Sequence, residues 1–301
     1  MNKIPMICLF LLSIHQIYAK VLIIIPVYNR PDFIEWQCNL FKKFLKDDYE
    51  IKMFNDADND PMQQAIEQTC ANLGITCIRV PQNLHNIDPN CYRASASFRH
   101  GEVLQFAFDN YGYDHDDIVA VFDSDVFLIH EWNIRDYMRD YDLNAAVVWG
   151  DPNAMITGSC VHFLIMNMPK LEHRRSFGFR AKFENGGFEE PGGDGLGYFK
   201  AHPDLNIKCS SSLAGVRSSE ALNLNAAEDV GVQLESRGYT PAEIDLILSI
   251  RNSNVYCDIG FWDTNLFLDY KHGSGWNGPT GQMVETKNRL VGKFIHSLLG
   301  Q

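Results

Sequence analysis

The sequence predicts an α/β fold in which a mostly parallel sheet is flanked by helices. After residue 20, short apolar runs rich in β-branched residues alternate with segments of helical periodicity. This order, strand then helix repeated up to a fourth strand, favours parallel strands covered on both faces. The 301 residues, of which 46% are hydrophobic, can fill the core of a single compact domain with two halves.

The first half divides cleanly into elements. Strands are predicted at 20–28, 49–56, 75–81 and 117–125, and helices at 30–47, 60–74 and 95–112. Pro31 stands in the first turn of the first helix, where proline is tolerated. Gly74 closes the second helix, as glycine often does.

The second half is less regular. Strands are predicted at 145–151, 160–168 and the start of 265–278, helices at 239–252 and 281–300, and a loop at the start of the Gly-rich segment 183–199. Thr240 has the side chain of an N-cap and precedes Pro241, a favoured first helical residue.

Charge and composition exclude some partners. The formal net charge is −12, and no block of Lys and Arg stands out, so a nucleic-acid partner is not expected. No segment after the N-terminus is apolar for long enough to cross a membrane, so at most peripheral membrane association is expected.

Residues 1–19 are typical of a signal peptide. Lys3 is followed by an apolar run, and cleavage after Ala19 is possible. Export would place the protein in the secretory pathway or outside the cytoplasm, in the lumen of the endoplasmic reticulum or Golgi if the source is eukaryotic. The alternative is an uncleaved hydrophobic segment that tethers a cytoplasmic protein to a membrane.

Eight cysteines are present, without any C-x-x-C pair, so a zinc site of that kind is not expected. Cys70 and Cys77 could pair across the turn from the second helix to the third strand, which the sequence leaves open. Most of the cysteines are interpreted as small buried hydrophobic residues.

Polar residues end three of the predicted strands, at 28–30, 55–56 and 123–125. Ligands of open parallel sheets bind just beyond the carboxyl ends of the strands. If Asp123 and Asp125 continued the fourth strand, their side chains would point to the same side. Two neighbouring carboxylates repel each other unless a cation lies between them, and Mg²⁺ or Mn²⁺ held with diphosphate oxygens suits this pattern.

Several segments together resemble GT-A nucleotide-sugar glycosyltransferases of the family 2 type. They are "VLIIIPVYNRP", "MFNDADND", "SASFRHGEVLQFAF", "IVAVFDSDVFLI" and "NLFLDYKHGSGWNG", and they span roughly residues 20 to 280. The resemblance implies a GT-A (Rossmann-like) domain at 20–301, with a nucleotide-binding half at 20–130 and an acceptor and catalytic half at 131–301. It also implies a hexosyltransferase that uses Mn²⁺ or Mg²⁺ and a nucleoside-diphosphate sugar, most simply a UDP-sugar.

The resemblance also assigns roles to residues. Those it places around the nucleotide are Pro26, Tyr28, Arg30, Asp56, Arg99, Asp123 and Ser124. Asp56 would accept a hydrogen bond from the base, and Arg99 would approach the nucleotide. Asp123 and Asp125 match the D-x-D motif of metal ligands, and His272 matches the late histidine that completes the metal shell or holds the diphosphate.

The general base is left open between two segments. Asp194 lies in a Gly-rich turn and is the preferred candidate, whereas Asp229, after Glu228, resembles the acidic pair of the acceptor-side helix. The base would remove the proton of a glycan, lipid or protein hydroxyl as that hydroxyl attacks the anomeric carbon. As the resemblance implies, such a direct displacement inverts the anomeric centre.

Other classes fit less well. A nucleotidyltransferase would need a Gly-rich phosphate loop after the first strand, which "IPVYNRPDF" lacks. A glycoside hydrolase would use two carboxylates without a metal. A catalytically silent carbohydrate- or partner-binding relative on the same fold remains the alternative. The histidines at 100, 162 and 202 are interpreted as structural or surface residues.

Overall fold

The structure is a computed structural model of the chain. It describes residues 19–85, 95–147, 159–180, 182–184, 187–189, 197–199, 201–210, 212–213, 230–236, 240–242, 244–245, 248, 260–262, 266–270 and 282–301.

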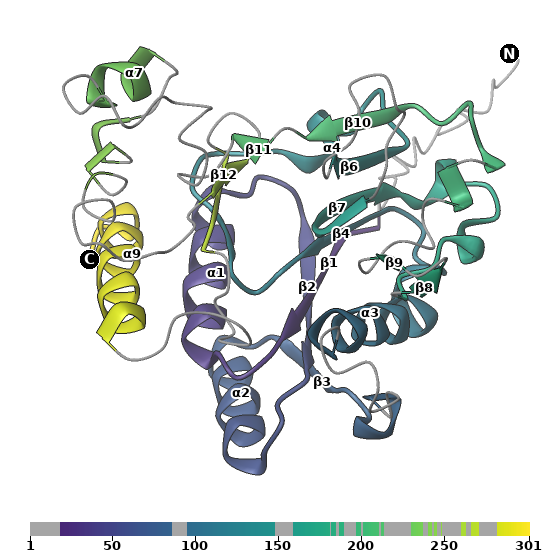
Figure 1. The fold of residues 1–301 in the computed structure, drawn as a ribbon, viewed down its shortest axis with the longest axis horizontal. Coiled ribbons are helices and arrows are strands. Elements are labelled where there is room, and N and C mark those ends of the chain that lie inside the picture. Colours follow the sequence, from purple (N-terminus) through teal and green to yellow (C-terminus); the bar gives the residue numbers. More distant parts are fainter. Residues whose placement is uncertain are drawn as a thin grey trace, which may run out of the picture.

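A seven-stranded sheet forms the centre of the described part, in the spatial order β10-β6-β7-β4-β1-β2-β3 (Figure 1). Its strands are β1 (Val21–Val27), β2 (Tyr49–Asn55), β3 (Thr76–Arg79), β4 (Ile118–Phe122), β6 (Leu143–Val147), β7 (Ser159–Asn167) and β10 (Ile207–Ser210). Strands β3, β2, β1 and β4 run parallel, and β7 is antiparallel to both of its neighbours. The predicted fold class, a mostly parallel sheet flanked by helices, is confirmed.

Alternate residues of β1 bury their side chains in two different cores. Val21, Ile23 and Ile25 pack with α1 (Pro31–Phe44) and α2 (Asp60–Leu73). Leu22 and Ile24 pack with α3 (Ser95–Ala107), which lies on the opposite face of the sheet (Figure 1). Because both faces are covered, this strand is a continuous apolar run in the sequence.

The helix ends follow local rules. The Asn59 side chain caps α2 by accepting a hydrogen bond from the Met62 N–H at 3.0 Å. Gly74 ends α2 in the left-handed conformation, with φ at 69°. The predicted helix 95–112 is α3 followed by one π-helical turn, η3 (Phe108–Gly112).

One predicted strand is wrong at its end. Strand β4 stops at Phe122, and residues 123–125 form a turn in which the Val126 N–H donates to the Asp123 carbonyl at 3.1 Å. The chain then enters β5 (Val126–Leu128), which belongs to a four-stranded antiparallel sheet in the order β11-β12-β13-β5. The partner of β5 is β13 (Phe267–Asp269), and the sheet continues through β12 (Gly260–Trp262) to β11 (Ser212–Leu213), so its other strands all lie far from β5 in the sequence. Local apolar pattern cannot reveal such a change of sheet.

The loop expected at the start of 183–199 is also wrong. Residues Lys182–Glu184 (β8) and Gly187–Glu189 (β9) pair as a short antiparallel hairpin. The sequence between them is Asn-Gly, the strongest short-range hairpin signal, which the high glycine content obscured.

Other helices whose bounds fall within the described residues are α4 (Ile134–Tyr137), α7 (Val230–Ser236) and α9 (Gln282–Leu299), with 3-10 turns η1 (Gln82–His85), η4 (Met168–Lys170) and η5 (Arg174–Ser176). The Ile244 N–H donates to the Thr240 carbonyl at 2.9 Å, which agrees with the predicted helix start. None of the helices in the described residues has the length and apolar character needed to cross a bilayer.

Candidate functional site

Three polar segments meet where the winding of the sheet reverses. From β1 the chain proceeds to β2 and β3 on one side, and then returns to β4 on the other side of β1. Ligands of open α/β sheets bind at such a reversal, beyond the carboxyl ends of the strands. Residues 28–30, 55–56 and 123–125 follow or end β1, β2 and β4, so the three predicted clusters flank this point.

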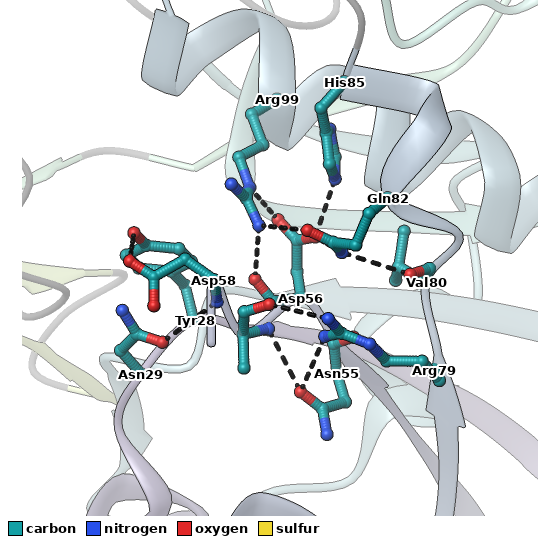
Figure 2. A network of polar contacts seen from close by, with 11 residues as sticks. Tyr28, Asn29, Asn55, Asp56, Asp58, Arg79, Val80, Gln82, His85 and Arg99 are labelled. Carbon is teal, nitrogen blue, oxygen red and sulfur yellow. Dashed lines mark hydrogen bonds and ion pairs between the residues drawn. The ribbon is translucent and has the colours of Figure 1, made fainter. Parts of the chain in front are cut away.

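Asp56 is the centre of a buried polar network that we call the Asp56 cluster (Asp56, Gln82, His85 and Arg99; Figure 2). The Asp56 side chain is only 6% exposed. Its Oδ1 accepts hydrogen bonds from His85 Nε2 at 2.7 Å and Gln82 Nε2 at 3.1 Å. Its Oδ2 accepts one from Arg99 Nε, and Arg99 Nη2 donates to the Asp56 carbonyl at 2.7 Å.

This network keeps the carboxylate charged. Burial by itself would raise the pKa of Asp56, but the hydrogen bonds from His85 and Arg99 outweigh burial and hold the pKa below its usual value. Both carboxylate oxygens are therefore engaged by protein donors. In this arrangement Asp56 holds the Arg99 guanidinium in place.

Tyr28 lies beside this guanidinium. The Arg99 guanidinium carbon is 5.0 Å from the centre of the Tyr28 ring, and Tyr28 Oη donates to Asp58 Oδ2 at 2.7 Å (Figure 2). Burial, then the Asp58 carboxylate, raises the pKa of Tyr28 to about 12, so the hydroxyl is neutral. A half-buried aromatic face and a cation together suit a planar ring such as a nucleobase.

Two other predicted nucleotide residues lie elsewhere. Pro26 is buried within β1, in register with Phe54 of β2. Arg30 donates to both carboxylate oxygens of Asp32, at 2.8 and 2.7 Å, and to Asn288 Oδ1 at 3.2 Å. Its guanidinium also stacks 3.4 Å from the centre of the Phe33 ring.

The turn formed by Asp123, Ser124 and Asp125, which we call the D-S-D turn, is held through its main chain. The fully buried Gln37 of α1 donates its amide Nε2 to the carbonyls of Asp123, at 2.9 Å, and Val126, at 2.8 Å. The Tyr270 N–H donates to the Asp125 carbonyl at 2.9 Å. The expectation that Asp123 and Asp125 point to one side as strand residues is thus wrong, because they lie in a turn.

His100 links the two clusters. Its Nε2 lies 3.3 Å from Asp123 Oδ1, while its neighbour Arg99 binds Asp56. Consecutive residues of α3 therefore contact the polar groups that follow two different strands. The interpretation of His100 as a structural or surface residue missed this contact, because the pairing of α3 with the D-S-D turn is not local.

The donor set of the D-S-D turn fits a hard divalent cation. Asp123, Ser124 and Asp125 are half-buried, and carboxylate oxygens are the preferred ligands of Mg²⁺ and Mn²⁺. Within the described ranges, no three His, Cys, Asp or Glu side chains lie close enough to hold a metal ion by themselves. The third predicted ligand, His272, lies outside the described residues, as do both candidates for the general base, Asp194 and Asp229.

A cationic group from the last helix lies against Tyr270, the residue whose N–H binds the D-S-D turn. Lys287 of α9 is only 4% exposed, and its Nζ lies 3.9 Å from the centre of the Tyr270 ring. Asn288 Oδ1 accepts hydrogen bonds from Tyr270 Oη and from Arg30. Sequence reasoning missed Lys287. The signal was present, since Lys287 lies four residues before the buried Val291 on the apolar face of an amphipathic helix.

No protein-family model and no curated protein sequence matches this chain. Among solved structures, it is similar to the galactosyltransferase LgtC in complex with donor and acceptor sugar analogues, with 12% identity, a TM-score of 0.42 and coverage of 92% of this chain and 96% of that one. It is similar to core-mannan synthase A of Aspergillus fumigatus in its Mn/GDP form, with 11% identity, a TM-score of 0.37 and coverage of 52% of this chain.

A third similar structure is glucosyl-3-phosphoglycerate synthase of Mycobacterium tuberculosis with Mn²⁺, UDP and glucosyl-3-phosphoglycerate, with 13% identity, a TM-score of 0.38 and coverage of 64% of this chain and 69% of that one. The matched region spans 61% of the mannan synthase, less than two thirds of that chain. All three are enzymes of glycosyl transfer.

Proposed function

We propose that this protein is a GT-A glycosyltransferase that moves a sugar from a nucleoside-diphosphate sugar to an acceptor hydroxyl. One observation carries the proposal: the Asp56 cluster and the D-S-D turn flank the reversal between β1 and β4, and consecutive residues Arg99 and His100 connect them. Arg99 of the Asp56 cluster offers a cation, next to the Tyr28 ring, for contact with a nucleobase. The D-S-D turn offers carboxylates for a metal ion that binds the diphosphate.

Each part of the donor would meet a different set of side chains. The Tyr28 ring and the Arg99 guanidinium would contact the base, because they form a half-buried aromatic and cationic surface. Asp123 and Asp125 would lie next to the diphosphate, and the positive charge of the buried Lys287 beside Tyr270 favours an anion on that side.

The proposed cofactor is Mn²⁺ or Mg²⁺, with Asp123, Asp125 and His272 as its ligands. When bound, such an ion stabilises the charge that develops on the leaving diphosphate. Inversion at the anomeric carbon, a UDP-sugar as donor, and a glycan, lipid or protein hydroxyl as acceptor are parts of the same proposal. Asp194 or Asp229 would take the proton of the acceptor hydroxyl.

We also propose export through residues 1–19. The charge and apolar pattern of this segment support a signal peptide, and a luminal enzyme would meet a nucleotide sugar only where that donor is supplied to the lumen.

Thermal unfolding of the full chain tests donor binding. The protein would be melted with UDP, GDP or CMP, each with and without Mn²⁺, because a ligand that binds only the folded state raises Tm. We expect a rise that requires both one nucleoside diphosphate and Mn²⁺, and that is absent in Asp125→Ala but retained in the exposed control Asp48→Ala. Transfer of a labelled sugar from the matching donor would then separate an enzyme from a silent binding relative.

Absence of any nucleotide-dependent shift in the native protein would contradict the proposal. A shift that needs no metal would contradict the role of Asp123 and Asp125 as metal ligands while leaving the nucleotide site standing.

A further inference from the structure

Two cysteines lie on either side of the turn from α2 to β3. Cys70 lies in the last turn of α2 and is fully buried, whereas Cys77 lies in β3 and is half-buried. The chain folds back between them at Gly74, and the Ile75 N–H donates to the Cys70 carbonyl at 2.9 Å. Both are free thiols in the structure.

The side chains lie on the same face of the sheet. Cys77 packs against the core between the sheet and the helices α1 and α2, and Cys70 belongs to that core. The next residue of β3, Ile78, packs on the opposite face. The two side chains interact, because the Cys77 thiol raises the pKa of Cys70 and the Cys70 thiol lowers the pKa of Cys77.

We propose that Cys70 and Cys77 form a redox-active pair that closes to an intramolecular disulfide when the protein meets a small disulfide oxidant such as glutathione disulfide. The fold favours this pairing, because Cys70 at the end of α2 and Cys77 in β3 pack on the same core across the turn at Gly74. The inference is independent of the proposed transferase activity.

The exchange begins at the more accessible sulfur. The Cys77 thiolate attacks one sulfur of glutathione disulfide, so that a Cys77–glutathione bond forms, the original S–S bond breaks and one glutathione thiolate leaves. Cys70 then gives up its proton and its sulfur attacks the Cys77 sulfur, which expels the second glutathione. Two protein thiols are oxidised, and one glutathione disulfide is reduced to two glutathione thiols that take up the protons.

The closed disulfide would tie the end of α2 to β3 next to β2. Cys77 is in register with Met53 of β2, two residues before Asn55, and Arg79 of the same strand binds the carbonyls of Asn55 and Ala57. A crosslink restricts the unfolded chain, so the oxidised protein should melt at a higher temperature, and the short loop should keep the rise small.

Mass spectrometry of the full chain tests the pairing directly. The reduced protein would be treated with glutathione disulfide at mildly alkaline pH, alkylated and digested. We expect a peptide crosslink between Cys70 and Cys77, a loss of two hydrogen masses from the protein, and reversal by dithiothreitol. Cys70→Ser should instead retain glutathione on Cys77, Cys77→Ser should leave Cys70 unmodified, and the buried control Cys38→Ser should form the same crosslink as the native protein.

Three results would overturn the inference. They are full alkylation of both thiols after oxidation, a lasting glutathione adduct on Cys77 of the native chain, and a crosslink from either residue to another cysteine. Each can be read on the native chain, so the test does not depend on the folding of a variant.

Discussion

The Asp56 cluster and the D-S-D turn are both acidic and both follow parallel strands, yet they are held in opposite ways. Asp56 is buried, and its carboxylate oxygens receive hydrogen bonds from His85, Gln82 and Arg99. The D-S-D turn is fixed through its carbonyl groups, by Gln37 and by the Tyr270 N–H.

The difference suggests a hypothesis: the Asp56 carboxylate stabilises the fold, whereas the carboxylates of the D-S-D turn are the ones we propose to bind a ligand. A buried charge must be neutralised by the protein, so the partners of Asp56 are part of the folded state. In the D-S-D turn Gln37 and the Tyr270 N–H bind main-chain carbonyls, and Asp123 Oδ1 also lies 3.3 Å from His100 Nε2. Four substitutions or conditions can break or sharpen this comparison.

Asp56→Ala should have the largest effect on stability. It leaves Arg99 and His85 next to each other without their counter-charge, and removing one partner of a buried ion pair costs about 3–5 kcal/mol. Urea unfolding would measure the loss. The control Asp58→Ala removes an exposed carboxylate from the adjacent loop and should cost no more than about 1 kcal/mol. Equal losses from the two variants would contradict the distinction.

Gln37→Met should have the next largest effect. Methionine has a similar length but cannot donate to the carbonyls of Asp123 and Val126, and loss of buried hydrogen bonds of this kind costs about 1–3 kcal/mol. The metal-dependent rise of Tm with nucleotide should also shrink, because the D-S-D turn loses its anchor. Glu35→Ala, exposed on the same helix, is the control. An unchanged metal response in Gln37→Met would mean that Gln37 only supports packing.

Acidic pH should remove the difference in free energy of unfolding between the native protein and Asp56→Asn. The pKa of Asp56 is lower in the folded state than its ordinary value. The stability it contributes is therefore complete above the unfolded-state pKa of about 3.9, and is lost as pH falls through the folded-state pKa. Urea unfolding of both proteins from neutral to acidic pH should give converging free energies. A difference that grows toward acid would show that Asp56 is protonated in the folded protein.

Asp125→Asn should have the smallest effect on stability and a large effect on ligand response. The residue is half-buried and its carbonyl contact with Tyr270 is kept, so the free energy of unfolding should change by no more than about 0.5 kcal/mol. The Mn²⁺-dependent nucleotide shift should disappear. Asp48→Asn, which is 72% exposed on its side chain, controls for the change of charge. A large loss of stability would place Asp125 with Asp56 as a structural carboxylate.

Local pattern predicted the first half of the fold well. The continuous apolar run of β1 and the spacing of Phe33, Leu40 and Phe41 on α1 correspond to buried faces, so the pattern follows directly from burial. Prediction failed where long-range pairing decides the structure. Strand β5 leaves the central sheet for β13, about 140 residues later in the chain, and no local pattern of residues 117–125 reports that partner.

The sequence by itself determined the parallel strands, their covering helices and the acidic residues that follow them. Buried strands and helix faces appear as local apolar patterns, and the polar residues at the strand ends follow these patterns directly in the sequence. Only the tertiary structure decided that the Asp56 carboxylate accepts hydrogen bonds from His85, Gln82 and Arg99. It also decided that Gln37 binds the D-S-D turn and that Lys287 lies against Tyr270. These contacts join elements far apart in the chain. Their hydrogen bonds and charges depend on distances of a few ångströms, which packing sets and sequence spacing does not.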